Sequence, residues 1–163
     1  MSPSPTLYGD VIELDFPATP AHATEPPAGL LVALALDPSF VGRSRFDILV
    51  HAVSEQVVRS LQPDFGQLRR IAIRGVIVTA VAEYPEFDFV SRFFAPAAGI
   101  DEDPVTGSAH CCLGPFWSER FGKREMTADQ ASARGGTVRV RVDVDRRILG
   151  GHAVPAPPGY PLC

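Results

Sequence analysis

Three consecutive carboxylates stand before an apolar segment in the stretch GIDEDPVTGSAHCCLGPFW, which runs from Gly99 to Trp117. They are Asp101, Glu102 and Asp103, and they lie in a loop marked by Pro104. A carboxyl group in a sheltered setting can have its pKa tuned for proton transfer, which makes it a candidate general acid or base. Asp103 is the favoured candidate because it is held directly against the proline.

The segment after Ser108 is apolar on nearly every face, and a helix of that kind belongs inside a core. The first N–H groups of a helix have no partner within it and lie at its positive end. Thr106, Gly107 and Ser108 are therefore predicted to present donors to a ligand, and Gly107 keeps the approach free of a side chain. This arrangement is typical of a site for a carboxylate or a phosphate.

The acidic run also has a purely structural interpretation. Carboxylates near a helix N-terminus interact favourably with the helix dipole while they stay solvated. The residues alone leave the catalytic and the structural interpretations open.

Length and composition describe a single globular domain. The chain has 163 residues, of which 45% are hydrophobic and 21% charged. It contains no apolar run long enough for a membrane span and no signal-peptide pattern at its start, so no membrane partner is expected. A net charge of −4 without a basic stripe argues against a nucleic-acid partner. Residues 1–8 are expected to be loose and residues 155–163 to form a tail.

The cysteines predict neither a metal site nor a disulfide. Cys111 and Cys112 are adjacent, and Cys163 is the last residue, so zinc-binding spacing is missing and no metal is expected. A reducing, cytoplasmic setting is the simplest interpretation.

Strands and short helices must position these residues, and the pattern is dominated by strands. Strands are predicted over residues 9–18, 45–53, 74–83 and 86–96, and a long strand or hairpin over 137–154. Short helices are predicted over 29–36, over 54–62 with Ser54 as its cap, and over 63–71 opened by Pro63. Residues 122–136 are interpreted as a linker. Because the strands do not alternate with long helices, the fold class is α+β rather than a doubly wound nucleotide fold.

The strings RFFAP and GIDEDPVTGSAH resemble the signature of the PhzF-like family, the phenazine-biosynthesis isomerases and their relatives. The likeness continues through GDVIELDFPA, LQPDF, RGVIVTA, LGPFW and DQASARGG, and it covers residues 9–154. It implies a diaminopimelate epimerase-like fold, in which each of two similar domains wraps a curved antiparallel or mixed sheet, or a barrel, around a central helix. The active site would lie in the cleft between them, and the helix after Ser108 would be one of the central helices.

The resemblance also implies roles for individual residues. Asp103 matches the family's active-site aspartate and Ser108 the serine at the helix start, so these are the expected catalytic residues. The backbone of Gly107 and Ser108, with Thr106 beside them, is expected to bind the carboxylate of a small metabolite. The family is believed to move a proton between carbon atoms without a metal or an organic cofactor.

This sequence departs from the family pattern in length. Family members are roughly twice as long, and their principal acid/base glutamate lies in an N-terminal domain that has no counterpart here. The chain is therefore interpreted as the C-terminal half of a PhzF-like protein, a truncated product or a fragment with little activity of its own. The alternative is a non-catalytic binding module that retains the fold and associates with itself, for instance as a homodimer.

Four further residues have competing interpretations. Arg92 could help to hold an anionic substrate or could be an exposed strand arginine, and the two are left open. His110 is favoured as a core residue over an acid or base, because it lies on an apolar helix. Cys111 and Cys112 are favoured as packing residues.

Overall fold

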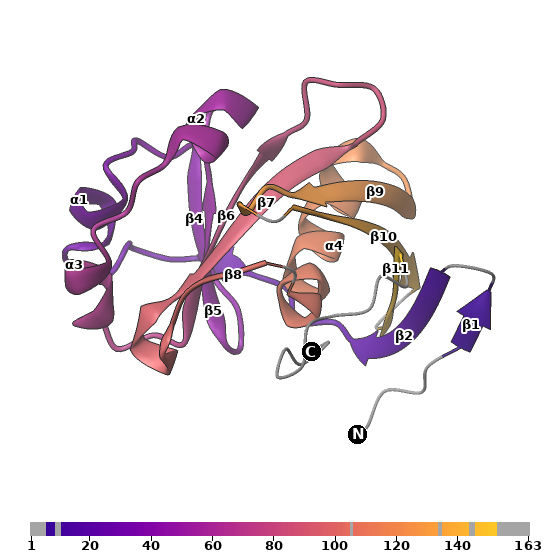
Figure 1. The fold of residues 1–163 in the computed structure, drawn as a ribbon, viewed down its shortest axis with the longest axis horizontal. Helices are drawn as coiled ribbons and strands as arrows, with labels where there is room; N and C mark the ends of the chain where they lie inside the picture. The colour runs from indigo at the N-terminus through magenta and orange to yellow at the C-terminus, as the bar shows by residue number, and fades with distance from the viewer. Residues whose placement is uncertain (1–5, 9–10, 105, 134, 144–145, 153–163) are drawn as a thin grey trace.

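The computed structural model describes residues 6–8, 11–104, 106–133, 135–143 and 146–152, which form one mixed sheet of eleven strands with α-helices on it (Figure 1). The strands are β1 (Thr6–Tyr8), β2 (Val11–Pro17), β3 (His22–Ala23), β4 (Phe40–Arg43), β5 (Asp47–His51), β6 (Gly75–Val81), β7 (Phe89–Ala95), β8 (Ile100–Asp103), β9 (Glu125–Gln130), β10 (Gly136–Asp143) and β11 (Arg146–His152). The helices are α1 (Leu30–Leu34), α2 (Glu55–Ser60), α3 (Phe65–Arg69), the 3₁₀ helix η1 (Pro96–Ala98) and α4 (Gly107–Phe121).

The sheet order is β1-β2-β11-β10-β9-β7-β6-β5-β4-β3, and β8 pairs with β7 outside this path. The pairs β5/β6 and β7/β9 are parallel, so each needs a crossover connection. The first crossover contains α2 and α3, and the second contains β8 and α4. The sheet is not closed, since it ends at β1 and β3. The α+β class is confirmed, with a curved, open sheet rather than a barrel.

The helices pack in two separate cores. Helix α4 lies in the concave side of β9, β10, β11 and β2, whereas α1, α2 and α3 lie at the other end of the molecule, beside β4 to β6 (Figure 1). Strand β7 supplies both cores: Phe89 and Phe93 pack with α4, and Val90 and Phe94 pack with the other helices. The expected burial of α4 is confirmed, because Leu113 and Trp117 are at most 1% exposed.

The short helices begin at the residues that can cap them. Ser54 caps α2 as predicted, since its hydroxyl accepts a hydrogen bond of 3.2 Å from the Val57 N–H. Asp64, rather than Pro63, is the cap of α3, and its carboxylate accepts a hydrogen bond of 3.1 Å from the Gln67 N–H.

Three segments expected to be irregular contain strands. The linker prediction for residues 122–136 is wrong, because β9 lies within them, and the acidic loop contains β8. The buried side chains of β9 are Met126, Ala128 and Gln130, and alanine and glutamine give little sign of a strand. Thr6–Tyr8, within the segment predicted to be loose, pairs with β2, and the predicted tail lies outside the described residues.

Candidate functional site

The three carboxylates before α4 have three different partners. Asp101 lies 3.4 Å from Nη2 of Arg69, and both side chains are more than half exposed. Glu102 points to the other side of β8, because successive side chains of a strand alternate, and it binds Arg92. Asp103 accepts a hydrogen bond of 2.7 Å from the hydroxyl of Thr106. Asp103 is therefore the carboxylate that is bonded to the start of α4.

Thr106 is the N-cap residue of α4, but its hydroxyl turns back to β8. A capping threonine usually accepts a hydrogen bond from an N–H group in the first turn of its helix. Here Oγ1 donates to Asp103, and the backbone N–H of Thr106 donates to Oε1 of Gln130 at 2.8 Å. Both donors of Thr106 are used within the protein, which favours a positioning role over the expected contact with substrate.

The end of β9 holds the loop that carries Asp103. Nε2 of Gln130 donates to the Asp103 carbonyl at 2.8 Å and to the Thr106 hydroxyl at 3.1 Å. The hydroxyl of Ser132 donates to the Pro104 carbonyl at 2.9 Å. Gln130 is completely buried, so its two hydrogen bonds to Thr106 are shielded from water.

Gly107 and Ser108 are the first two residues of α4, which is 15 residues long. Their N–H groups donate no hydrogen bond to the residues that the structure describes. They lie at the positive end of the helix, where a negative charge is stabilised. This geometry supports the anion site expected from the sequence, and its ligand stays a prediction.

Arg74 brings a positive charge to Ser108. Its Nη2 lies 3.2 Å from the Ser108 hydroxyl, and its Nε and Nη2 donate to the buried Asp47 carboxylate at 2.9 and 2.5 Å. Because a guanidinium can only donate, the Ser108 oxygen is the acceptor, and its own proton is directed elsewhere. The guanidinium also lies 4.7 Å from the ring centre of Phe46.

Arg92 is engaged inside the protein. Its side chain is 11% exposed and binds the Glu102 carboxylate through two hydrogen bonds, of 2.9 and 2.8 Å. Its Nη1 donates to the carbonyls of Val58 and Leu61 at the end of α2, at 3.0 and 2.8 Å. These contacts favour a structural role, and a contact of Arg92 with substrate stays a prediction.

His110 is fully buried in the first turn of α4. Its Nδ1 lies 2.7 Å from the Thr106 carbonyl, so Nδ1 carries the proton, because a carbonyl oxygen only accepts. Burial lowers the pKa of His110 to about 4, and the ring is therefore neutral at pH 7. The ring packs against Phe89, with the ring centres 6.2 Å apart. These contacts favour the core interpretation.

The adjacent cysteines also lie in the core around α4. Cys111 is 4% exposed and Cys112 is not exposed, as expected of packing residues. Within the described ranges, no group of three or more histidine, cysteine or acidic residues is placed to hold a metal ion. None of the helices in those ranges combines the length and apolar character that crossing a membrane requires.

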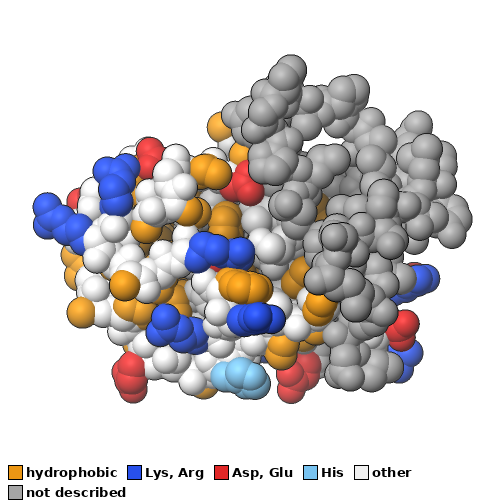
Figure 2. All heavy atoms as spheres, turned by 90° about the horizontal axis from the view of Figure 1, so that it is seen from below, with side chains coloured by type: hydrophobic (Ala, Val, Ile, Leu, Met, Phe, Trp, Pro, Cys, Tyr) orange, Lys and Arg blue, Asp and Glu red, His pale blue; other side chains and the backbone are white. Residues whose placement is uncertain are grey.

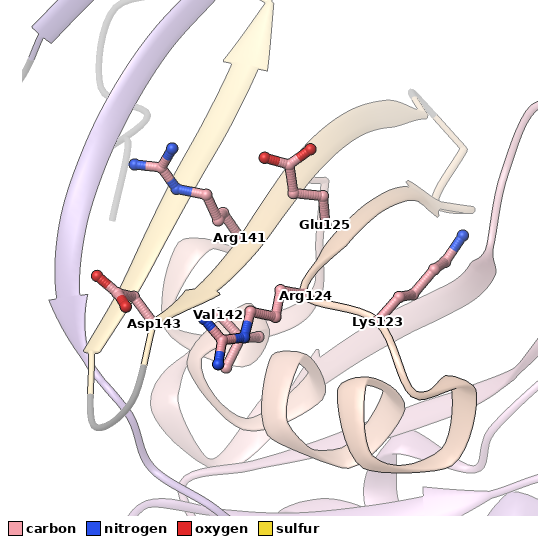
Figure 3. A pocket seen from close by; sticks show the side chains of 6 residues that line it. All are labelled: Lys123, Arg124, Glu125, Arg141, Val142 and Asp143. Atoms are coloured by element: carbon pink, nitrogen blue, oxygen red, sulfur yellow. The ribbon is translucent and has the colours of Figure 1, made fainter.

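Two surface hollows lie away from the Asp103 loop. One, of about 620 Å³, lies beside β9 and β10 and is lined by Lys123, Arg124, Glu125, Arg141, Val142 and Asp143, so that it carries charges of both signs (Figure 3). The other is lined by Pro27, Ala28, Gly29, Gln67, Arg70, Ile71 and Ala72. On the face seen from below, apolar and basic side chains are interleaved over the described part of the surface (Figure 2). Neither hollow is lined by a residue of the Asp103 loop, and the case for that loop rests on its hydrogen bonds.

Sequence reasoning missed Asp47, Arg74 and Gln130 as parts of this site. Each is a polar residue at the end of an apolar or buried strand segment, and two of them are almost completely buried. A buried polar group must find partners, so Asp47 and Gln130 carried a usable signal. The identity of the partners depends on which strands lie side by side.

Comparison with known proteins places the chain among longer relatives. A family described as PhzC-PhzF, phenazine biosynthesis-like protein, matches residues 11–159. An uncharacterized isomerase of Halalkalibacterium halodurans is 49% identical over 147 residues, which cover 90% of this chain and 56% of the relative. An uncharacterized isomerase of Pseudomonas aeruginosa is 50% identical over 141 residues, which cover 86% of this chain and 53% of the relative.

Solved structures agree with the sequence comparison. A phenazine biosynthesis protein of the PhzF family from Enterococcus faecalis has a TM-score of 0.85 at 35% identity, covering 91% of this chain and 56% of that one. A putative PhzC/PhzF protein from Clostridium difficile has a TM-score of 0.82 at 37% identity, with the same coverage of 91% and 56%. This chain thus spans about half the length of the proteins that it matches.

Proposed function

Because the chain belongs to the PhzC-PhzF family of phenazine biosynthesis-like proteins, an isomerase-like family, we propose that it takes part in proton transfer between carbon atoms of a small carboxylate-bearing metabolite, without a metal or an organic cofactor. One observation carries the proposal. The Asp103 carboxylate is bonded to the N-cap of a buried helix, beside the N–H groups of Gly107 and Ser108.

Each residue at the start of α4 has a distinct role in the proposed reaction. The Asp103 carboxylate accepts a proton from one substrate carbon as one member of an acid/base pair, and the other member returns a proton to another carbon. The N–H groups of Gly107 and Ser108 bind the substrate's carboxylate, where the helix dipole favours negative charge. The Ser108 hydroxyl accepts a hydrogen bond from Arg74, and its own proton is directed to the substrate.

The resemblance implies that the reaction needs a second acid/base group. In the family, that group is a glutamate of the N-terminal domain, and no glutamate of this chain matches its motif. The 163 residues cover little more than half of the matched relatives. We therefore expect these residues on their own to bind weakly and to turn over slowly but measurably.

Deuterium uptake at carbon tests the proposal directly. The protein is incubated in deuterated buffer with a panel of small unsaturated and hydroxylated carboxylic acids, and uptake is measured by mass spectrometry. Loss of an acid/base group should slow the reaction by roughly 100-fold or more, so Asp103→Asn should abolish most of the uptake. Asp101→Asn is the matched control, because Asp101 lies on the same strand but pairs with an exposed arginine.

Two outcomes would contradict the proposal. Uptake that survives Asp103→Asn would place the chemistry elsewhere. Binding of a panel compound at the start of α4 without any uptake would favour the non-catalytic binding module, which sedimentation would then test for self-association.

A further inference from the structure

The side-chain amide of Gln130 has one orientation that satisfies its surroundings. The N–H of Thr106 can only donate, so Oε1 must face it, and the carbonyl of Asp103 can only accept, so Nε2 must face that. The two distances are both 2.8 Å, which is normal for such bonds. The amide oxygen and nitrogen are therefore assigned by their partners.

The same Nε2 fixes the direction of the next hydrogen bond. It donates to the Thr106 hydroxyl at 3.1 Å, so that oxygen is already an acceptor and its single proton points elsewhere. The acceptor is Oδ2 of Asp103, 2.7 Å away. The bonds thus run one way, from the Gln130 amide through the Thr106 hydroxyl to the Asp103 carboxylate, and each polarises the next.

This chain of hydrogen bonds starts from a rigid part of the fold. Gln130 is completely buried and pairs with Ser91 of β7 and Gly136 of β10, in the middle of the sheet. Thr106 is 6% exposed, so water competes little for these bonds. A hydrogen bond donated to the charged form of a carboxyl group favours that form.

We propose that Gln130 is a positioning residue, which acts through the Thr106 hydroxyl to hold the Asp103 carboxyl in one orientation and in its ionised, proton-accepting form. This role of Gln130 depends on the proposed function in one respect only, which is that Asp103 accepts a proton from the substrate. The hydrogen-bond chain itself can be tested without any substrate.

The test is a pH titration of the Asp103 carboxyl carbon by NMR in the isotope-labelled protein. Each carboxyl signal is assigned by residue, and Arg69 and Arg92, the partners of Asp101 and Glu102, are left unchanged. In the wild type, the Gln130 side-chain amide signal should follow Asp103 with the same midpoint. In Thr106→Val the titration midpoint of Asp103 should move to higher pH, and the pH-dependent shift of the Gln130 amide signal should become smaller. Thr106→Ser should restore the midpoint and the shift of the amide signal.

The chain offers a matched control for the loss of a buried hydroxyl. The Thr79 hydroxyl accepts from Trp117 Nε1 at 3.0 Å and donates to the Val90 carbonyl at 2.6 Å, away from the site. Thr79→Val should lower stability and leave the Asp103 midpoint in place. Gln130→Met should raise that midpoint, because the Thr106 hydroxyl loses its fixed direction. If Gln130→Met does not fold, the Thr106 variants alone test the proposal.

The proposal is overturned if folded Thr106→Val titrates at Asp103 like the wild type, or if Thr79→Val shifts the midpoint equally. Deuterium uptake separates this failure from that of the proposed function. If the hydrogen-bond chain and the proposed function are both correct, Thr106→Val should slow deuterium uptake by roughly 10- to 100-fold, because the acid/base group is misplaced. Thr106→Ser should not slow it. A shifted Asp103 midpoint in Thr106→Val, together with deuterium uptake that is unchanged by Asp103→Asn, would support the hydrogen-bond chain and contradict the proposed function.

Discussion

The guanidinium of Arg92 and the carboxylate of Glu102 form a two-point ion pair that ties the strand before α4 to the end of α2. Nε lies 2.9 Å from Oε2 and Nη2 lies 2.8 Å from Oε1, while Nη1 binds the Val58 and Leu61 carbonyls. The two side chains are 11% and 18% exposed, so the pair is largely shielded from solvent. Asp103 is the next residue along the strand, and the pair therefore anchors the loop that carries it.

Breaking this ion pair should cost far more than breaking an exposed one. Arg92→Met leaves the Glu102 carboxylate without its partner and should lower the free energy of unfolding by about 2–4 kcal/mol. Combining it with Glu102→Gln should recover part of the loss. The exposed pair of Arg69 and Asp101 is the control, and Arg69→Met should cost about 0.5 kcal/mol or less. Urea unfolding measures all of them, and equal losses at the two pairs would contradict the anchoring role.

Gly75 should not tolerate a side chain. A Cβ there would overlap Cζ of Phe93, which is packed in the core around α4, and would lie 3.1 Å from Oδ1 of Asp47. Gly75→Ala should therefore lower the free energy of unfolding by about 1–3 kcal/mol, as overpacking does. Because Asp47 binds Arg74, the amide signal of Ser108 should shift as well.

Gly66→Ala is the matched control for Gly75→Ala. It is exposed in α3, and a Cβ there would meet only the Asp64 carboxylate, at 3.3 Å. Gly66→Ala should be neutral or should stabilise by up to about 1 kcal/mol, because alanine is the better helix former. A similar loss at both glycines in urea unfolding would show that close packing at Gly75 is not the cause.

His110 should make the fold sensitive to acid. Its pKa is about 4 in the folded protein, against 6.5 for an unperturbed histidine, because burial disfavours the charged ring. Between these pH values the unfolded chain binds more protons, so the free energy of unfolding falls as pH falls from about 6.5 towards 4. The contribution is fully present above pH 6.5 and amounts to about 3 kcal/mol at most.

His110→Asn isolates this effect, because its amide can still donate to the Thr106 carbonyl but does not titrate. The variant should be less stable at pH 7 and should lose less stability between pH 6.5 and 4 than the wild type. The other titrating groups act equally in both proteins. Parallel stability curves over this range would mean that His110 does not titrate on unfolding.

Sulfate should bind to the start of α4 if the N–H groups of Gly107 and Ser108 form an anion site. At a hundred times its dissociation constant it should add about 2.7 kcal/mol of stability and shift the amide signals of Gly107 and Ser108. Gly107→Val should abolish both effects by covering the approach. The φ angle of Gly107 is not positive, so valine fits the backbone there, and lost binding would reflect the covered approach.

Ser108→Ala should weaken sulfate binding only modestly, because the backbone donor survives while the hydroxyl is lost. Binding is measured on folded protein by NMR titration. Unchanged affinity in folded Gly107→Val would reduce the start of α4 to an ordinary helix end.

The sequence by itself determined the local features of this protein. The apolar run after Ser108 predicted a buried helix, Ser54 marked the start of α2, and runs of β-branched residues marked β6 and the β10/β11 hairpin. The signature around Asp103 also indicated the family. These features could be read because caps, periodicity and short motifs depend on residues that are close together in the chain.

Only the tertiary structure decided which side chains complete the site. Gln130 binds the Asp103 loop across 24 to 27 residues, Arg74 reaches Ser108 across 34, and Arg92 reaches the end of α2 across more than 30. These partners meet because β7 pairs with β9 and β5 with β6, in parallel and across long crossovers. Local periodicity carries no record of such pairings, so the sequence marked the carboxylates but not what binds each of them.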